Sequence, residues 1–240
     1  QEFYEEQESG DELTWASGNS GFKLAMSEAK TEEYPTVQSA NGKVGKCAKL
    51  ETRSTGEFGN MVGMPIAAGN LFIGNFSILN AIADPLGATR FGTPFYNKPL
   101  RLTGYYKYKS GEKFYEHGEY TSRKDIFNIY AIFYDGVKYD SAGKRTDVTL
   151  DGNLPNQNYE HPNMVALALV SNPQETEGDE WKFFDIPFDY QRYGKKIDEA
   201  RLAKGEYKIG IIFASSKDGA TFEGAPGSTL LIDEVELIYE

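Results

Sequence analysis

An alternation of apolar and charged residues predicts a half-buried β-strand in the first quarter of the chain. In residues 46–53, KCAKLETR, Ala48 and Leu50 fall on one face and charged side chains fall on the other. Because the apolar set must face a core, Glu51 and Arg53 are expected on the open face.

A second alternating stretch, residues 100–108, predicts a longer strand whose leucines face the core. Its outward positions then include Arg101, Tyr105 and Lys107, and we expect them on the same open face of one sheet as Glu51. A shift of one residue would send these charges inward, at a prohibitive cost in free energy.

Other stretches are apolar almost without interruption, which is typical of strands inside a sheet. Residues 127–135 predict a central strand that ends at an Asp-Gly turn. Further strands are predicted at 164–171, 181–190, 205–216 and 229–239. Pro187 ends the third of these five strands or places it at a sheet edge. The last strand ends with the chain, so we expect it to pair inside a sheet.

The segments between these strands are rich in turn-forming residues. The Gly- and Pro-rich stretch 55–98 predicts short strands joined by turns, with one helical turn at 79–83. Residues 136–162 are expected to form a long polar loop, and 198–203 a short helix. The segment 215–228 is expected to be a loop on the rim of the fold.

These elements predict an all-β fold, a two-sheet antiparallel β-sandwich of the jelly-roll type with eight to ten strands. The alternative is two separate small sandwiches, but no linker divides residues 14–240. We therefore expect a single β-jelly-roll domain over 14–240, preceded by an acidic N-terminal tail or linker, 1–13. Residues 14–22, TWASGNSGF, are expected to be a strand end that enters a tight loop.

The composition excludes several classes of partner. The net charge of −11 would repel a phosphate backbone, so we expect no nucleic-acid binding and no docking on an anionic membrane. Because no apolar run approaches 18 residues, we expect no transmembrane segment. Cys47 is the single cysteine, so no intramolecular disulfide can form, and we expect it to pack as a small buried hydrophobe.

Candidate catalytic chemistry is limited to carboxylates. His117 and His161 lack the spacing of a zinc site, and no nucleotide-binding loop is present. Glycoside hydrolysis needs two carboxyl groups about 5–9.5 Å apart, and Glu51 is the candidate acid, base or nucleophile. The alternative is that Glu51 is a surface residue balanced by Lys49 and Arg53.

One carboxylate is a candidate metal ligand. Asp233, in the final strand, could bind a structural Ca²⁺ together with backbone carbonyls. Alternation places Asp233 opposite Glu234 and Glu236, so the three do not form a two-carboxylate face. The alternative is that Asp233 accepts hydrogen bonds from turn amides. We expect no other cofactor.

Sugar binding requires aromatic faces and a few fixed donors and acceptors. The open strand faces and the loops supply both kinds of side chain. The candidate ligand-binding residues are Trp15, Asn19, Glu51, Arg53, Arg101, Tyr105, Lys107, Tyr130, Phe222 and Glu223. For Trp15 and Tyr130 the alternative is packing in the core.

Several motifs carry a family resemblance: WASGNSG, KLET, AAGNLFIG, FGTPFYNKPLRLTGYYKYKSG, IYAIFYD and SSKDGATFEGAPGSTLLIDEVELIY. Over residues 14–239 the chain resembles the putative carbohydrate metabolism domain of Bacteroidetes proteins. The resemblance implies a β-jelly roll with a cleft placed like that of sandwich glycoside hydrolases, in which one catalytic glutamate survives. Glu51 is the candidate for that glutamate. It also implies export to the periplasm or cell surface, lipid anchoring, and a preceding immunoglobulin-like domain that this chain lacks.

Three functions follow from these observations. The first is a non-catalytic glycan-binding module of an exported carbohydrate-utilisation protein, which binds an oligo- or polysaccharide in an open cleft on one sheet. The second is a divergent glycoside hydrolase or lyase that uses Glu51. The third is a structural or adhesion β-sandwich of a surface assembly.

Overall fold

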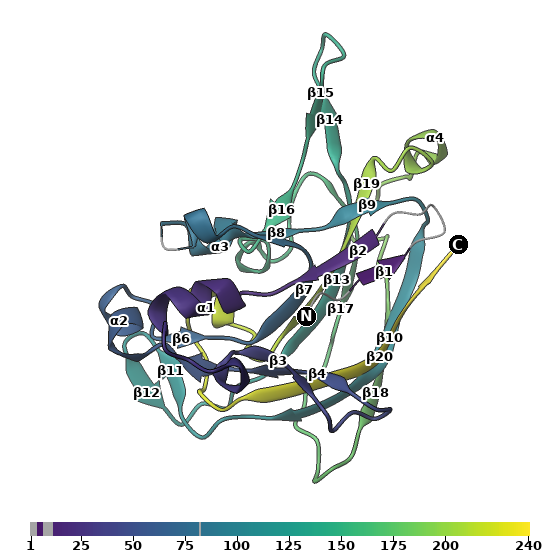
Figure 1. Ribbon diagram of the computed structural model, residues 1–240. Helices are drawn as coiled ribbons and strands as arrows, with labels where there is room; N and C mark the ends of the chain where they lie inside the picture. The colour runs from purple at the N-terminus through teal and green to yellow at the C-terminus, as the bar shows by residue number, and fades with distance from the viewer. Residues whose placement is uncertain (1–3, 7–11, 82) are drawn as a thin grey trace.

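The computed structural model describes residues 4–6, 12–81 and 83–240, and their strands form a β-sandwich of two main antiparallel sheets (Figure 1). Within these residues the larger sheet has nine strands. Six of them follow the order β1 (Tyr4–Glu6), β2 (Glu12–Ala16), β7 (Asn70–Phe76), β19 (Tyr207–Ala214), β13 (Asn128–Asp135) and β17 (Met164–Leu169). The others are β8 (Thr89–Phe91), β9 (Thr93–Phe95) and β16 (Leu150–Asp151).

The second sheet has five strands in the described part of the chain. Their order is β18 (Lys182–Pro187), β10 (Pro99–Lys109), β20 (Thr229–Tyr239), β4 (Cys47–Glu51) and β3 (Thr36–Ser39). The predicted all-β, two-sheet antiparallel jelly roll is therefore confirmed. The predicted eight to ten strands were too few, because the described residues place nine strands in one main sheet and five in the other. The final strand spans the predicted residues and lies between two neighbours, as expected for a strand that ends with the chain.

Short elements connect and cover the sheets. Three small pairs are β5 (Arg53–Ser54) with β6 (Ile66–Ala67), β11 (Phe114–Glu116) with β12 (Glu119–Thr121), and β14 (Val137–Tyr139) with β15 (Arg145–Asp147). The α-helices are α1 (Asn19–Ala25), α2 (Gly56–Met61), α3 (Pro85–Ala88) and α4 (Glu199–Leu202). Single 3₁₀ turns occupy Thr31–Glu33, Ile78–Asn80, Pro155–Gln157 and Gly219–Thr221. Among the residues described, no helix is long and apolar enough to cross a membrane.

One hydrophobic cluster fills the space between the two sheets. It joins residues from Leu13 near the start of the chain to Ile232 near its end, and includes Leu102 and Ile129 from opposite sheets. All four of these side chains are less than 5% exposed. The continuity of this cluster fits one sandwich better than two separate ones.

A second hydrophobic cluster lies on the outer face of the nine-stranded sheet. Phe72, Tyr130 and Ile212 from β7, β13 and β19 pack there against Leu154 and Tyr159. These two belong to residues 136–162, the covering segment. The sheet is thus buried on both faces. This explains why β13 is apolar without alternation, since each of its faces meets a core.

The covering segment corrects one prediction. Residues 136–162 were expected to be a polar loop, but they contain the β14–β15 hairpin, which projects from the body of the molecule, and β16, which pairs with β8 (Figure 1). Leu150, Leu154 and Tyr159 are buried in the second cluster. These apolar residues are separated by polar ones at no regular spacing, so the pattern does not reveal their burial.

The N-terminal segment also differs from expectation. Residues 14–22 were expected to enter a tight loop, yet Asn19 begins α1, whose Phe22 is buried. The 1–13 segment was expected to be a tail, but Tyr4–Glu6 pairs with β2, which begins at Glu12. Residues 1–3 and 7–11 of that segment lie outside the described ones. The predicted helix at 198–203 is confirmed as α4, whose N-cap is Asp198.

Candidate functional site

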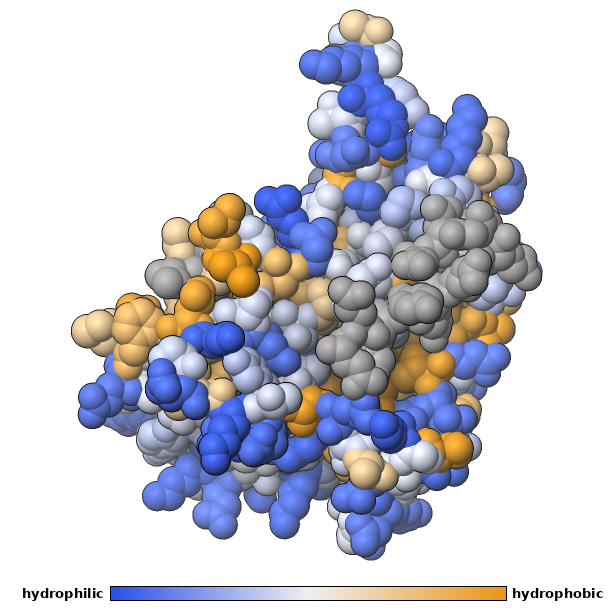
Figure 2. Space-filling view, in the orientation of Figure 1, coloured by the Kyte–Doolittle hydropathy of each residue, from blue (hydrophilic) through white to orange (hydrophobic). Residues whose placement is uncertain are grey.

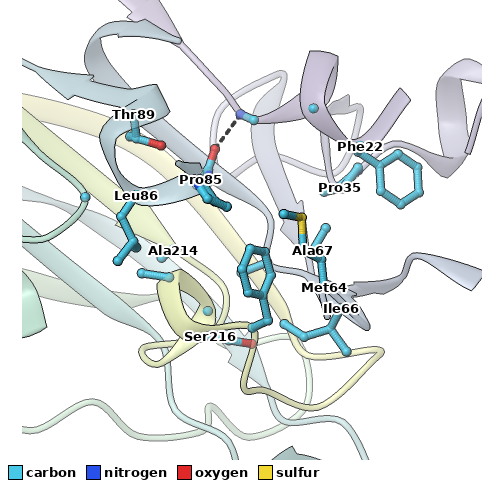
Figure 3. A pocket seen from close by; sticks show the side chains of 18 of the residues that line it. Phe22, Pro35, Met64, Ile66, Ala67, Pro85, Leu86, Thr89, Ala214 and Ser216 are labelled. Atoms are coloured by element: carbon cyan, nitrogen blue, oxygen red, sulfur yellow. Dashed lines mark hydrogen bonds between the residues drawn. The ribbon is translucent and has the colours of Figure 1, made fainter. Parts of the chain in front are cut away.

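A pocket of about 190 Å³ opens on the outer face of the nine-stranded sheet. Its floor comes from β7, β13 and β19, and its walls come from α1, α2, α3 and the segment 216–222. The pocket therefore combines segments from the first third, the middle and the end of the chain. Figure 3 shows Leu86 on one side of this space and Met64 and Ile66 on the other.

Aromatic side chains on the outer face of the nine-stranded sheet form the floor of the pocket. Phe72 and Tyr130 point to this face, and Phe91 from β8 lies beside both. The ring centroids of Phe91 and Tyr130 are 6.2 Å apart and the rings are perpendicular, as in an edge-to-face contact. Ala214, two residues after Ile212 on β19, adds a small side chain to the same face and leaves room above it.

Three polar side chains of the pocket form hydrogen bonds that hold it together. Asn70 Oδ1 accepts a hydrogen bond of 2.7 Å from the Gly18 backbone amide at the start of α1. Asn128 Nδ2 donates to the Tyr159 hydroxyl at 3.0 Å. Ser216 Oγ donates to a buried carboxylate behind the wall. These bonds fix the walls to the floor.

Phe222, one of the predicted ligand-binding residues, lines the pocket in a left-handed backbone conformation, with φ of 59°. This conformation costs free energy for a bulky residue, and such strain gathers at ligand clamps. The turn behind it is tight: a Cβ at Gly224, where φ is 158°, would lie 2.6 Å from Ser216 Oγ. The backbone behind Phe222 is therefore closely packed.

The charges of the pocket are few. Lys217 is the single charged residue among the described residues that line it, and its side chain is exposed. That lining contains no Asp, Glu or His. A pocket lined in this way offers mainly apolar contacts, with one lysine and no carboxylate or imidazole in the described lining.

Most of the predicted polar site lies on the other side of the sandwich. The register pairs Lys107 with Leu231 and Leu231 with Lys49, so Glu51 and Lys107 share the outer face of the five-stranded sheet. The predicted common face is therefore confirmed. Glu51 lies 2.6 Å from Lys49 Nζ and 3.1 Å from Arg53, which matches the balanced-charge alternative.

The other charged candidates on this face also have partners. Arg101 Nε donates to Asp185 at 2.6 Å, which raises the Arg101 pKa. The Lys107 ammonium lies 3.4 Å from Asp179 and 5.2 Å from the ring centroid of Trp181. This face is a network of surface ion pairs.

Tyr105 is the predicted aromatic residue on this face, and its ring is partly accessible. The Lys43 ammonium lies 4.2 Å above it, and the ring of Phe183 is 5.1 Å away. Phe183 is itself 57% exposed. Tyr105 and Phe183 thus form a small aromatic step on an otherwise charged sheet.

Asp233 lies too far from Glu51 to act as the second carboxylate of a glycosidase. Thr229 pairs with Glu51 across the sheet, and Asp233 lies four residues further along β20. At about 3.3 Å per residue this puts them about 13 Å apart along the strand. The two carboxylates of a glycosidase lie at most about 9.5 Å apart.

Asp233 serves the local backbone. Its carboxylate accepts hydrogen bonds of 3.0 Å from the Val44 and Glu234 amides, as in the capping alternative. Over the described part of the chain, no three His, Cys, Asp or Glu residues gather in a way that could hold a metal ion. Cys47 nearby is buried, as predicted, and burial raises the pKa of its thiol.

Three further predicted ligand-binding residues contact other parts of the protein and do not line the pocket. Trp15 stacks on Phe213 in the core between the sheets, with ring centroids 5.9 Å apart, so its alternative of core packing is confirmed. Asn19 uses both ends of its amide on the backbone of Thr36, at 2.7 and 3.0 Å. Glu223 lies 3.6 Å from His117 and is not part of the pocket lining.

Of the predicted ligand-binding residues, Tyr130 and Phe222 line the pocket, and Tyr130 is also buried in the second cluster, as its core-packing alternative expects. Most of the other lining residues were not predicted. Met64, Leu86 and Ala214 were not candidates, because an isolated apolar residue in a Gly-rich segment or strand is usually core. The sequence of β13 was the available signal for this pocket. A strand that is apolar on both faces requires a covering layer on its outer face, and a pocket can form beneath such a layer.

Comparisons with known proteins agree on one family. A family model described as "Putative carbohydrate metabolism domain" matches residues 1–238. A solved structure from Bacteroides vulgatus ATCC 8482, described as a putative glycoside hydrolase, is 51% identical, with a TM-score of 0.90 over 100% of this chain and 91% of that one. Another from Bacteroides thetaiotaomicron VPI-5482, with the same description, is 48% identical, with a TM-score of 0.87 over 100% of this chain and 67% of that one. A search of curated proteins found no match.

Proposed function

The chain belongs to the putative carbohydrate metabolism domain family, and from this premise we propose that it is a glycan-binding module that holds its ligand at the pocket of the nine-stranded sheet. It would serve an exported carbohydrate-utilisation protein at the periplasm or cell surface. Tyr130 and Phe222 of the predicted ligand set line this pocket.

The observation that carries the proposal is the combination of aromatic lining and missing carboxylates. Aromatic side chains present faces to the C–H surfaces of a sugar. A hydrolase pocket needs two carboxyl groups at the scissile bond. The described lining supplies the first and lacks the second. Phe222, held at a strained backbone angle at the pocket, is the residue we assign to stacking.

The proposal is tested by a glycan array followed by affinity measurements on any glycan that binds. Phe222→Ala should weaken binding about tenfold, which corresponds to about 1.4 kcal/mol. Tyr105→Ala, on the opposite face of the sandwich, is the matched control and should leave the affinity unchanged. If Tyr105→Ala weakened binding and Phe222→Ala did not, the site would lie on the charged face with Glu51, Arg101 and Lys107.

A second candidate is glycoside hydrolysis, which the descriptions of the two similar structures favour. Glu51 is the carboxylate we would assign to it. Turnover of a bound glycan that is lost in Glu51→Gln would establish this function, while binding without turnover supports the module. Absence of binding to any glycan would favour a structural or adhesion role.

A further inference from the structure

The pocket is apolar from its floor to its mouth. At the floor lie Phe72 and Tyr130, which are almost fully buried. Near solvent lie Leu24 of α1 and Phe58 of α2, which are 44% and 41% exposed. Figure 2 shows apolar side chains gathered in this region of the surface, around α1, α2 and α3. A continuous apolar surface of this kind favours a ligand group that is itself apolar along its length.

Three of the polar side chains that line the pocket form hydrogen bonds within the protein. Asn70 binds the Gly18 amide, Asn128 binds the Tyr159 hydroxyl, and Ser216 binds a buried carboxylate. A sugar ring at the floor would therefore lose water from several hydroxyls and find few donors and acceptors to replace it, which is unfavourable. The part of the ligand that enters deepest must carry few or no hydroxyl groups.

The size of the pocket limits this group to about one ring. Its volume of about 190 Å³ exceeds the roughly 150 Å³ of an apolar cavity that binds benzene. It is smaller than the roughly 300 Å³ at which pockets for larger ligands begin. The perpendicular rings of Phe91 and Tyr130 expose edges and faces with which an aromatic ring could pack.

Lys217 places one cation beside this apolar space. Its side chain is exposed, and it is the only charged residue in the described lining. In a chain with a net charge of −11, an ammonium group next to an apolar pocket favours a ligand with an electron-rich oxygen close to its apolar part. An ester carbonyl has this character.

We propose that the pocket binds an aromatic acyl group that is esterified to a glycan. The ring enters the pocket, the ester carbonyl lies toward Lys217, and the sugar stays at the mouth beside Phe222. This inference rests on the proposed glycan-binding function and specifies which part of the glycan is recognised.

The test compares one ligand with and without its ester. The probe is a feruloylated arabinoxylan oligosaccharide, measured by calorimetry before and after mild alkaline removal of the ferulate. We expect the esterified form to bind at least tenfold more tightly. Ala214→Leu, which fills the space above the floor, should remove this difference. Ala142→Leu, in the exposed β14–β15 turn, is the matched control and should retain it.

The outcomes separate this inference from the glycan-binding proposal. Equal affinity of both forms would overturn the inference and leave glycan binding in place. Failure of both forms and of methyl ferulate to bind would also overturn it, and the array with unesterified glycans then decides on glycan binding by itself. If Ala214→Leu unfolds at the same temperature as the wild type, its loss of preference for the esterified oligosaccharide reflects a filled pocket and not a damaged fold.

Discussion

The Ser216 hydroxyl at the pocket wall donates a hydrogen bond of 2.6 Å to Asp125, a carboxylate that is only 2% exposed. Ser216 also contacts Thr52 at 2.5 Å, and Thr52 contacts Ser215 at 2.8 Å. Each hydroxyl has one proton, so Ser215 donates to Thr52, Thr52 to Ser216 and Ser216 to Asp125. This series of hydrogen bonds connects the segment 216–222, which forms a wall of the pocket, to the protein interior.

Asp125 also accepts hydrogen bonds from Ser228 and from the Ala225 and Ile126 amides, at 2.7 to 2.9 Å. Asp125→Ala would leave these buried donors without an acceptor. We expect it to lower the free energy of unfolding by about 2–5 kcal/mol. Asp179→Ala, at a fully exposed carboxylate, is the control and should change it by less than about 1 kcal/mol. Urea denaturation measures both, and equal effects would contradict the assignment.

The same carboxylate should make stability depend on pH. Burial raises the pKa of Asp125 above its usual 3.8, against the opposing effect of its hydrogen bonds. A raised pKa in the folded state means that the stability from Asp125 is present at low pH and is lost as pH rises through the raised value. Relative to Asp125→Asn, which cannot titrate, the wild type should lose stability as pH rises above about 4. A constant difference across pH 3–8 would contradict this.

The strand faces were predictable because alternation is a local signal. Residues 46–53 and 100–108 oriented Glu51 and Lys107 correctly, since a register shift would bury charge. The sharing of one sheet was an added inference, because alternation alone does not say which strands are neighbours. It holds here because β20 pairs with both.

The pocket was predictable only in part, because it depends on contacts between distant segments. Phe222 and Tyr130 were candidates for their aromatic rings, but Gly18, Met64 and Leu86 meet them only after the chain has folded. Trp15 was predicted to bind ligand but packs in the core, and the reason is the same: its position depends on contacts with a distant segment. A tryptophan beside a Gly-Ser loop can face a cleft or a core, and its stacking on Phe213 decides for the core.

The ion pair that fixes α4 to the nine-stranded sheet should require arginine. Arg201 donates to both oxygens of Asp135 at 2.8 and 2.6 Å and to Glu206 at 2.6 Å. Lysine cannot form this fork. Arg201→Lys should therefore lower the free energy of unfolding by about 1–3 kcal/mol. Arg145→Lys, at the exposed pair with Asp147, is the matched control and should change it by less than about 0.5 kcal/mol. Thermal denaturation of both variants checks the difference.

We also expect residues 14–240 to unfold as one cooperative unit. The strand β20 lies between β10 and β4, so removing residues 230–240 leaves one edge of each neighbour unpaired and separates β18 and β10 from β4 and β3. It also removes Leu230 and Ile232 from the core. The truncated chain should lose its cooperative melting transition in calorimetry. A truncated chain that still melts in one sharp transition would show that the final strand is dispensable.

Neighbouring residues of β20 allow a test of which face meets the core. Ile232 is 3% exposed in the cluster between the sheets, whereas Leu231 lies on the opposite face and is only half-buried. Ile232→Ala removes buried methyl groups and leaves a cavity, so it should lower the free energy of unfolding by about 2–5 kcal/mol. Leu231→Ala removes a side chain of the same composition from the outer face and should lower it by about 1 kcal/mol or less. Equal effects in urea denaturation would contradict the register of β20 between β10 and β4.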